Sequence, residues 1–425
     1  MIAIVEFEHW KSYAQASLHV DPLTVLIGTN ASGKSNALDA LLFLHRVASG
    51  SLLTAALQGD STQQPIRGGL EWAAHRPGSA FALGVRSRVD EFLDYEYRIE
   101  ASIRDNRCEL TSEQLTRIKY RVAKGDQRGA EIGRIRLFRT DACEPEAPTI
   151  VARLYNEKQG SPRPLGRSTA VLFQLMGQKL RQEIQEGVQQ VLRDLQTIFV
   201  LDPIPSHMRG YSPLSDRLEP DARNIAGVLA ALPDSHKQDI ERTLTSYASQ
   251  LPEKDIRRVY AETVGKFNAD AMLYCDEHWR DGGADTPVDA RGMSDGTLRF
   301  LAILTALLTR PAHSLLVVEE VDNGLHPSRA HLLLGMLREV GALRQVDVLA
   351  TTHNPALLDA MGTVMVPFIS VAHRDRATGN SLLTLLEDMA DLPKLLAQGP
   401  VGHLSSQGLL EASLRQQTQS NGVHA

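Results

Sequence analysis

A chain of 425 residues with 43% hydrophobic and 23% charged residues is long enough for two or three structural units, and its composition excludes a disordered or fibrous protein. The formal net charge of -6 gives the surface as a whole no attraction for polyanions, so any nucleic-acid contact needs a local basic patch. The three cysteines, Cys108, Cys143 and Cys275, are isolated, which excludes a disulfide framework and a cysteine metal site and is typical of a reducing cytoplasm.

The N-terminal segment is predicted to form strands followed by a helix. Residues 2–7 alternate in polarity, a second strand is expected at 17–20, and an apolar strand at 23–27 precedes a helix over 34–47. This start has neither the basic residues nor the apolar core of a signal peptide. Apolar runs elsewhere are far shorter than the roughly 20 residues that span a bilayer. We therefore expect a cytoplasmic protein without membrane contact.

The turn after the apolar strand carries the strongest motif. It reads Gly28-Thr29-Asn30-Ala31-Ser32-Gly33-Lys34-Ser35, followed by Asn36, and matches the pattern G-x-x-x-x-G-K-[ST] between a strand and a helix. Glycines let the backbone curl so that its N–H groups cradle phosphate oxygens. Lys34 is expected to bridge the β- and γ-phosphates of ATP and Ser35 to bind Mg²⁺. The flanking strand and helix favour this interpretation over a glycine-rich turn without a ligand.

The middle of the chain is predicted to be rich in strands and then helical. Period-two alternation at 95–101 and 117–122 indicates strands, and the break at 124–126 indicates a hairpin. Residues 168–198 have a helical pattern, the Pro-rich stretch 202–213 marks a boundary, and helical patterns resume from 224 to about 267.

A basic stretch lies in this strand-rich region. Five cations would lie on two strand faces, and three more are nearby: Arg117, Lys119 and Arg121, then Arg134 and Arg136, then Lys124, Arg128 and Arg139. Only Asp126 and Glu131 oppose them. Such a hairpin suits nucleic-acid phosphates, an acidic partner protein or an ordinary solvated face, and the sequence leaves these three interpretations open.

The C-terminal third alternates helix and strand. Helices are expected at 295–309, 327–340 and 354–360, and strands at 314–320, 346–351 and 363–371, which predicts a mostly parallel sheet. We infer one α/β head that is split by insertions. The five predicted segments are 1–48 (first half of the head), 49–165 (β-rich lobe), 166–285 (helical insertion), 286–390 (second half of the head) and 391–425 (helical tail).

Three further segments of this third supply candidate site residues. Ser294-Asp295-Gly296 begins a helix, where Ser294 is a good N-cap and the helix N-terminus can hold a γ-phosphate. Glu319 and Glu320 follow an apolar strand, at the sheet edge where ligands bind. Glu319 is expected to hold Mg²⁺ and Glu320 to orient or deprotonate the attacking water. His353 follows the next strand and is expected to contact the γ-phosphate.

These motifs resemble those of the ABC-type ATPases related to RecF, SMC and the OLD proteins, in a stand-alone bacterial form. The similarity rests on residues 294–301, 319–327 and 351–355, and extends to Ser212-Pro213 and 224–229. It implies an α/β fold, a P-loop NTPase head of ABC type with an antiparallel β lobe and a helical insertion. It also implies a head-to-head dimer or higher oligomer with ATP between the heads, in which the Ser294 loop faces Lys34 of the partner subunit.

The chain departs from the pattern of ABC transporters at several positions. Glu319 stands where transporters carry Asp, Val321 replaces a frequent Pro, and His326 stands where the loop after the catalytic Glu carries Asp, which argues against a transporter subunit. Gln63 and Gln64 are candidates for the glutamine that contacts Mg²⁺. OLD nucleases carry a C-terminal nuclease domain, whereas only about 55 residues follow Val371, so we expect no nuclease domain here.

Two functions follow from this sequence. The first is an ATP-dependent dimerisation switch that controls a separate effector protein; the resemblance implies a role in bacterial anti-phage defence or DNA maintenance. The second is a RecF/SMC-like DNA-binding clamp or scaffold, in which ATP is mainly structural.

Overall fold

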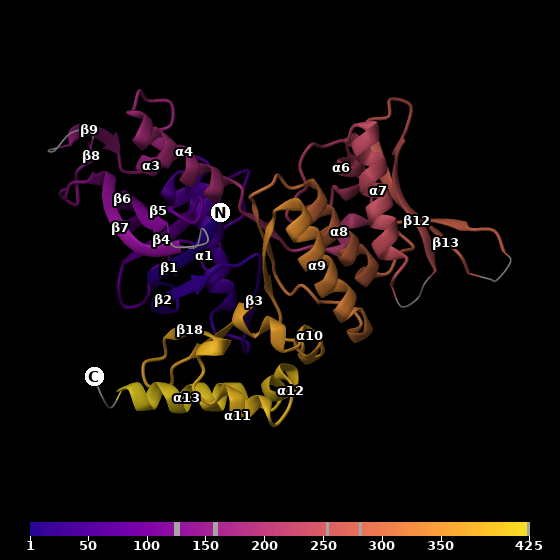
Figure 1. Ribbon diagram of the computed structural model, residues 1–425. Coiled ribbons are helices and arrows are strands. Elements are labelled where there is room, and N and C mark those ends of the chain that lie inside the picture. The colour runs from indigo at the N-terminus through magenta and orange to yellow at the C-terminus, as the bar shows by residue number, and fades with distance from the viewer. Residues whose placement is uncertain (123–127, 156–159, 252–254, 280–282, 423–425) are drawn as a thin grey trace.

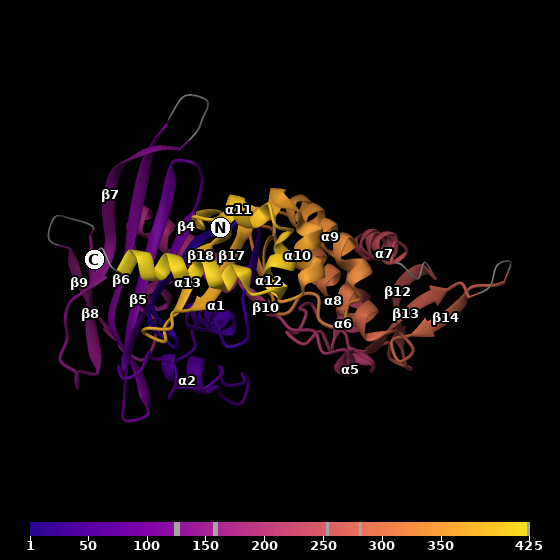
Figure 2. The ribbon, with the colours of Figure 1, turned by 90° about the horizontal axis from the view of Figure 1, so that it is seen from below.

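The computed structural model describes residues 1–122, 128–155, 160–251, 255–279 and 283–422, of which 416–422 are described by backbone alone. Three β-sheets are distributed along the molecule (Figure 1). A large antiparallel sheet lies at one end, a small antiparallel sheet lies at the other end, and a mostly parallel sheet lies between them, as a second view also shows (Figure 2).

The central sheet positions the candidate site. Its six strands are, in spatial order, β10 (Phe199–Leu201), β15 (Leu315–Val318), β16 (Asp347–Thr351), β3 (Leu23–Ile27), β17 (Ile369–Arg374) and β18 (Ser381–Leu385). The first five run parallel, and β18 is antiparallel to β17. β3, β15 and β16 are buried along their whole length, which is typical of a parallel sheet covered on both faces. The predicted parallel sheet is therefore confirmed.

Alternate residues of the central strands point into two separate cores. Leu26 and Val317 belong to a core shared with the large sheet and four helices, α1 (Lys34–Ala48), α2 (Leu53–Gln58), α3 (Val171–Gln174) and α4 (Gln182–Gln196). Val25 and Val318 belong to the other core, shared with α8 (Asp295–Thr309), α9 (Ala330–Arg344) and α10 (Pro355–Met361). Because mainly apolar side chains cover both faces of the sheet, ligand-binding polar groups are expected at its strand ends.

The large sheet is the predicted β-rich lobe, and it also includes the first two strands of the chain. Its eight antiparallel strands are, in spatial order, β2 (Tyr13–His19), β1 (Ile2–Trp10), β4 (Ala80–Arg88), β5 (Leu93–Arg104), β6 (Arg107–Val122), β7 (Arg128–Thr140), β8 (Thr149–Leu154) and β9 (Ser161–Gly166). The predicted strands at 95–101 and 117–122 lie within β5 and β6. The predicted break at 124–126 lies outside the described residues.

The small sheet corrects the expectation of a continuous helical pattern from 224 to 267. Two helices, α6 (Ile225–Ala231) and α7 (Asp234–Ala248), are followed by strands, and α5 precedes them. The small sheet consists of β11 (Ser212–Pro213), β13 (Asp270–Glu277), β12 (Ile256–Val264) and β14 (Thr286–Asp289), while α5 spans Pro205–Met208. In β12, Val259 and Ala261 are buried in the core, whereas Arg258 and Glu262 on the other face of the strand are not. In the sequence, the polar residues of this strand resemble the polar face of a helix, which is why a helix is expected there.

The C-terminal part completes the central sheet and adds short helices. These are the 3₁₀-helices η1 (Pro327–Arg329), η2 (Thr363–Phe368) and η3 (Leu386–Asp388), and the helices α11 (Leu392–Leu396), α12 (Val401–Ser406) and α13 (Leu409–Gly422). The strand expected at 363–371 begins only at Ile369, because 363–368 form η2, which contains Pro367.

No helix in the described ranges is long and apolar enough to cross a membrane. The boundaries of the five predicted segments and the cytoplasmic location stay predictions.

Candidate nucleotide-binding site

The predicted phosphate loop is the turn between β3 and α1. Gly28, Ala31 and Gly33 have positive φ angles of 145°, 63° and 116°, a curled backbone that turns N–H groups toward a bound anion. A Cβ atom at Gly28 would lie 2.2 Å from the carbonyl oxygen of Ala372, and one at Gly33 would lie 2.9 Å from the hydroxyl of Tyr13. Only glycine therefore fits at Gly28 and Gly33.

The charge and the free polar groups of this loop suit a phosphate. Lys34 Nζ donates to the carbonyl oxygens of Gly28 (2.5 Å) and Thr29 (3.0 Å), so the ammonium lies over the loop. Burial lowers the pKa of Lys34, and the nearby Glu320 and Glu319 oppose that shift. The hydroxyl of Ser32 is buried and has no hydrogen-bond partner among the residues described. An ammonium, a narrow backbone cradle and an unpaired hydroxyl fit a phosphate group.

Asn30 and Asn36 flank this cradle. Asn30 is exposed, as are Thr29 and Ala31. The side-chain amide of Asn36 donates to Ser12 Oγ at 2.7 Å, and the backbone carbonyl oxygen of Asn36 accepts from Trp10 Nε1 at 2.7 Å. Asn36 therefore ties the first turn of α1 to the β1–β2 hairpin.

The two predicted Mg²⁺ ligands lie together at the sheet edge. Glu319 directly follows β15, and its Oε1 accepts a hydrogen bond from Ser35 Oγ at 2.8 Å. Its Oε2 is paired with Arg67, a residue of the segment between α2 and β4 that sequence reasoning missed. A hydroxyl and a carboxylate are hard oxygen ligands of the kind that Mg²⁺ prefers. In this structure the guanidinium of Arg67 balances the negative charge of the Glu319 carboxylate.

Neither Gln63 nor Gln64, the two glutamine candidates, contacts Glu319 in the structure described. The amide of Gln63 donates to Ser51 Oγ at 3.1 Å, and Gln64 is exposed. The side chain of Arg67 contacts Glu319 instead. Lys11 Nζ donates to the backbone carbonyl oxygen of Arg67 at 2.7 Å. A cation from this segment, rather than an amide, is therefore the contact of the carboxylate.

Glu320 and His353 face each other across the ends of β15 and β16. His353 Nδ1 lies 4.0 Å from Glu320 Oε1, and the side chains are 58% and 46% exposed, so both are open to a ligand. The side-chain amide of Asn323 donates to Glu320 Oε2 at 3.3 Å. The backbone of Glu320 has a φ angle of 48°, in the left-handed region that non-glycine residues rarely adopt. Such strain is often found at functional sites.

The Ser294 segment is a capped helix start held by neighbouring groups. Ser294 Oγ accepts from the backbone N–H of Thr297 at 3.1 Å, as an N-cap does. Asp295 pairs with Arg209 at 2.6 Å. A Cβ atom at Gly296 would lie 2.8 Å from the carbonyl oxygen of Gly324, in the loop after Glu320. The predicted N-cap is confirmed, and its contact with a partner subunit stays a prediction.

Asp202 is a second site residue that sequence reasoning missed. It follows β10, whose Leu201 is in register with Val318 of β15, so Asp202 and Glu319 are neighbours at the same sheet edge. Burial and the charges of Glu319 and Glu320 raise the pKa of Asp202, while Arg299 and Arg67 oppose the rise. Arg299 belongs to α8, and its Nη1 lies 4.0 Å from Asp202 Oδ1. Acids and cations therefore alternate along this edge.

A cavity of about 310 Å³ adjoins the start of α1. Ser12 and Asn36 line it on the side of the phosphate loop, and the remaining lining is rich in cations and includes Trp72. Its cationic residues are Lys11, Arg67, Arg76 and Arg374, and His75 also lines it. Such a lining offers cations to an anionic group, and an aromatic side chain, Trp72, on which Arg76 stacks at 3.9 Å.

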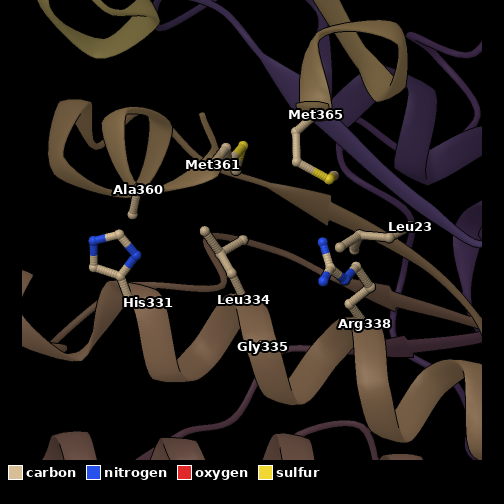
Figure 3. A pocket seen from close by; sticks show the side chains of 8 residues that line it. All are labelled: Leu23, His331, Leu334, Gly335, Arg338, Ala360, Met361 and Met365. Carbon is tan, nitrogen blue, oxygen red and sulfur yellow. The ribbon is translucent and has the colours of Figure 1, made fainter. Parts of the chain in front are cut away.

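A second cavity, of about 190 Å³, lies on the other side of the central strands, between α9 and the segment of α10 and η2 (Figure 3). Leu334, Met361 and Met365 line it together with His331 and Arg338, and Leu23 closes one end. It contains none of the predicted site residues.

Three of the seven described cations of the basic stretch are engaged in ion pairs. Arg117 is nearly buried and lies 3.3 Å from Glu183, and Arg128 pairs with the buried Asp94 at 2.6 Å. Arg134 Nη1 lies 2.7 Å from Glu96 Oε1. Lys119, Arg121, Arg136 and Arg139 are exposed, while Lys124 and Asp126 lie outside the described residues. The cationic character of this surface is therefore smaller than the sequence suggests.

Comparison with known families identifies the chain. The model of a family described as "AAA domain, putative AbiEii toxin, Type IV TA system" matches residues 23–359. The chain belongs to this family. Together with the parallel sheet and phosphate loop, this membership confirms the ABC-type P-loop ATPase head with an antiparallel β lobe. The search of curated proteins found no match.

Several solved structures are similar in fold at low sequence identity. An SmcHead bound to the C-winged helix domain of ScpA is 13% identical, with a TM-score of 0.47 over 90% of this chain and 96% of that chain. An SMC head domain from Thermotoga maritima is 12% identical, with a TM-score of 0.41 over 90% and 98%. An Smc head domain with an extended coiled coil, bound to the C-terminal domain of ScpA and derived from Pyrococcus furiosus, is 13% identical, with a TM-score of 0.45 over 93% and 99%.

Proposed function

We propose that this chain binds and hydrolyses ATP with Mg²⁺, and that ATP binding closes two copies into a head-to-head dimer. The observation that carries the proposal is the hydrogen bond from Ser35 Oγ to Glu319 Oε1. It joins the end of the phosphate loop to the acid after β15, so that one point of the sheet edge offers both phosphate-binding and Mg²⁺-binding groups.

The residues of the site divide the work of hydrolysis. The phosphate loop, residues 28–35, holds the triphosphate, and Lys34 neutralises its charge. Ser35 and Glu319 hold Mg²⁺, which when bound neutralises and orients the phosphates. Glu320 directs and deprotonates the attacking water, and His353 donates a hydrogen bond to the γ-phosphate. The cationic cavity beside Asn36 accommodates the nucleoside end.

Dimerisation supplies protein contacts to the γ-phosphate from the partner subunit. Ser294, Asp295 and Gly296 lie at the N-terminus of the fifteen-residue helix α8, where the dipole and the free N–H groups attract an anion. In a head-to-head dimer, this segment faces Lys34 of the partner subunit. Closure by ATP changes the surface that a separate effector protein contacts, and hydrolysis releases it. We place this switch in bacterial anti-phage defence.

Glu320→Gln is expected to trap the closed dimer. The amide keeps the size of the side chain but cannot accept the proton of water, so ATP binds and is not cleaved. Light scattering coupled to gel filtration should show a twofold increase in molar mass with MgATP and none without nucleotide. The same increase must vanish in the Glu320→Gln, Lys34→Ala double variant.

A matched control is Glu387→Gln, which changes an exposed acid of η3. This variant should hydrolyse ATP like the parent and show no stable dimer. An unchanged mass of Glu320→Gln in MgATP would contradict the switch.

The exposed cations of the β6–β7 hairpin support a second candidate function, a DNA-binding clamp in which ATP is mainly structural. Lys119 and Arg121 lie near the end of β6 and are exposed. Phosphate contacts made by such residues weaken steeply with salt. Duplex DNA that binds at 50 mM salt, loses affinity at 200 mM and stimulates ATP hydrolysis would favour the clamp over the effector switch.

A further inference from the structure

The loop after β15 and the loop after β16 are joined by hydrogen bonds that involve the hydroxyls of two adjacent threonines. Thr351 is the last residue of β16 and Thr352 follows it, and they are 1% and 0% exposed. A buried hydroxyl is costly unless it has a partner, so its contacts are informative. Both hydroxyls bond to the loop that carries Glu320.

Thr351 holds the peptide of the predicted general base. Its Oγ1 accepts from the backbone N–H of Glu320 at 2.8 Å, and its carbonyl oxygen accepts from the N–H of Val321 at 3.0 Å. These two bonds flank the residue whose φ angle is 48°. A left-handed conformation at a non-glycine residue persists only when its surroundings hold it in place.

Thr352 braces the next part of the same loop. Its Oγ1 donates to Asp322 Oδ1 at 2.6 Å and accepts from the N–H of Asn354 at 3.0 Å. Its own N–H donates to Leu26 at 3.3 Å, in the strand that leads into the phosphate loop. His353 lies between Thr352 and Asn354, which this hydrogen bond joins. The positions of His353 and Glu320 therefore depend on the hydroxyls of the two adjacent threonines.

We propose that Thr351 and Thr352 are positioning residues that hold Glu320 and His353 in the geometry needed for hydrolysis. This inference rests on the proposed ATPase function. Neither threonine reaches the phosphate loop through its side chain in the contacts described, so both act through other residues. A misplacement of a reacting group by about 1 Å can lower a rate by about 100-fold.

Thr351→Val tests the inference because valine keeps the shape and removes the acceptor. We expect kcat for ATP hydrolysis to fall by about 10- to 100-fold, while the KM for ATP changes by less than about twofold. Thr351→Ser restores the hydroxyl and should recover kcat to within about threefold of the parent. A purely structural role would not separate kcat from KM or be rescued by serine.

Thr305→Val is the matched control for the loss of a buried hydroxyl. Thr305 is 0% exposed within α8, and its Oγ1 has no hydrogen-bond partner in the described part of the chain. This variant should keep kcat within about twofold of the parent. Thr351→Ala serves as a second variant if Thr351→Val does not fold, and the same fall in kcat is expected.

The outcomes separate the inference from the proposed function. If the parent chain hydrolyses ATP and Thr351→Val matches it in kcat, the positioning role is overturned while the ATPase stands. The positioning role is also overturned if Thr351→Ser is as slow as Thr351→Val. If the parent itself shows no hydrolysis, with or without a partner, the ATPase function and the positioning role both fall.

Discussion

Lys34→Ala is expected to abolish ATP binding in the micromolar range. The variant loses the ammonium that lies over the loop carbonyls of Gly28 and Thr29, and with it a charged hydrogen-bond donor for the phosphates. It also removes a cation close to Glu320 and Glu319, while Arg67 stays paired with Glu319. Hydrogen bonds to charged groups contribute about 1.5–3 kcal/mol each, so we expect Kd for ATP to rise by at least about 100-fold. Titration with a fluorescent ATP analogue in the presence of Mg²⁺ measures this.

Lys394→Ala is the control for the removal of a lysine. The Lys394 side chain is 81% exposed on α11 and pairs only with Asp391 among the contacts described. Its removal should change neither Kd nor the melting temperature. If Lys34→Ala kept its affinity within about threefold while remaining folded, the loop would not be the phosphate site, and the proposed function would lose its foundation.

The site residues that the sequence predicts belong to local motifs, most of them at strand ends and one, Ser294-Asp295-Gly296, at the start of α8. The phosphate loop follows β3, the paired acids follow β15, and His353 follows β16. A motif of this kind carries its own context, because the strand before it and the helix after it can be recognised in the same few residues. Parallel pairing of β15, β16 and β3 then brings the three ends together.

The residues that the sequence missed are positioned by tertiary structure. Arg67 reaches Glu319 across 252 positions of sequence, in a segment without a recognisable motif. Asp202 meets the site only because Leu201 pairs with Val318, which no local pattern reveals. Thr351 was within a recognised motif, yet its role depends on the hydrogen bond to the Glu320 peptide.

The prediction of a helical pattern as far as residue 267 is wrong, and the sequence shows the reason. Pro252 and Gly265 interrupt the pattern in the sequence, and both disfavour a continuous helix. The outward-facing Arg258 and Glu262 of β12 imitate the polar face of a helix. The region of the small sheet therefore combines the helices α6 and α7 with strands, so α7 packs on β12 rather than continuing along the chain.

Glu113 is expected to make folding stability depend on pH. It is fully buried, and its two carboxylate oxygens accept from the backbone N–H groups of Val171 and Leu172 at 2.6 and 2.7 Å and from Tyr97 Oη at 3.0 Å. Burial raises its pKa from 4.5 to about 7, although these hydrogen bonds oppose the rise. The side chain of Glu113 therefore joins the β-rich lobe to the start of α3. Its raised pKa means that the carboxyl group is more readily neutral than an exposed one.

The sign of the effect follows from the raised pKa. Between pH 4.5 and about 7 the folded state holds a proton at Glu113 that the unfolded chain has released, so stability is greatest below this window and falls as the pH rises through it. A shift of this size corresponds to about 3 kcal/mol in total, of which about 2–3 kcal/mol is expected between pH 5 and pH 8. Urea unfolding at both pH values measures the difference.

Glu113→Gln should remove this pH dependence. The carboxamide has one acceptor oxygen, so one of the N–H groups of Val171 and Leu172 loses its partner, which costs about 1–3 kcal/mol at pH 5. At pH 8 the variant also escapes the burial of a charge, so its deficit relative to the parent should shrink by about 2–3 kcal/mol. Glu146→Gln, at an exposed position of the same lobe, should leave the parent's pH profile unchanged. A deficit of Glu113→Gln that is equal at both pH values would mean that Glu113 is charged in the folded protein throughout, and that hydrogen bonding outweighs burial.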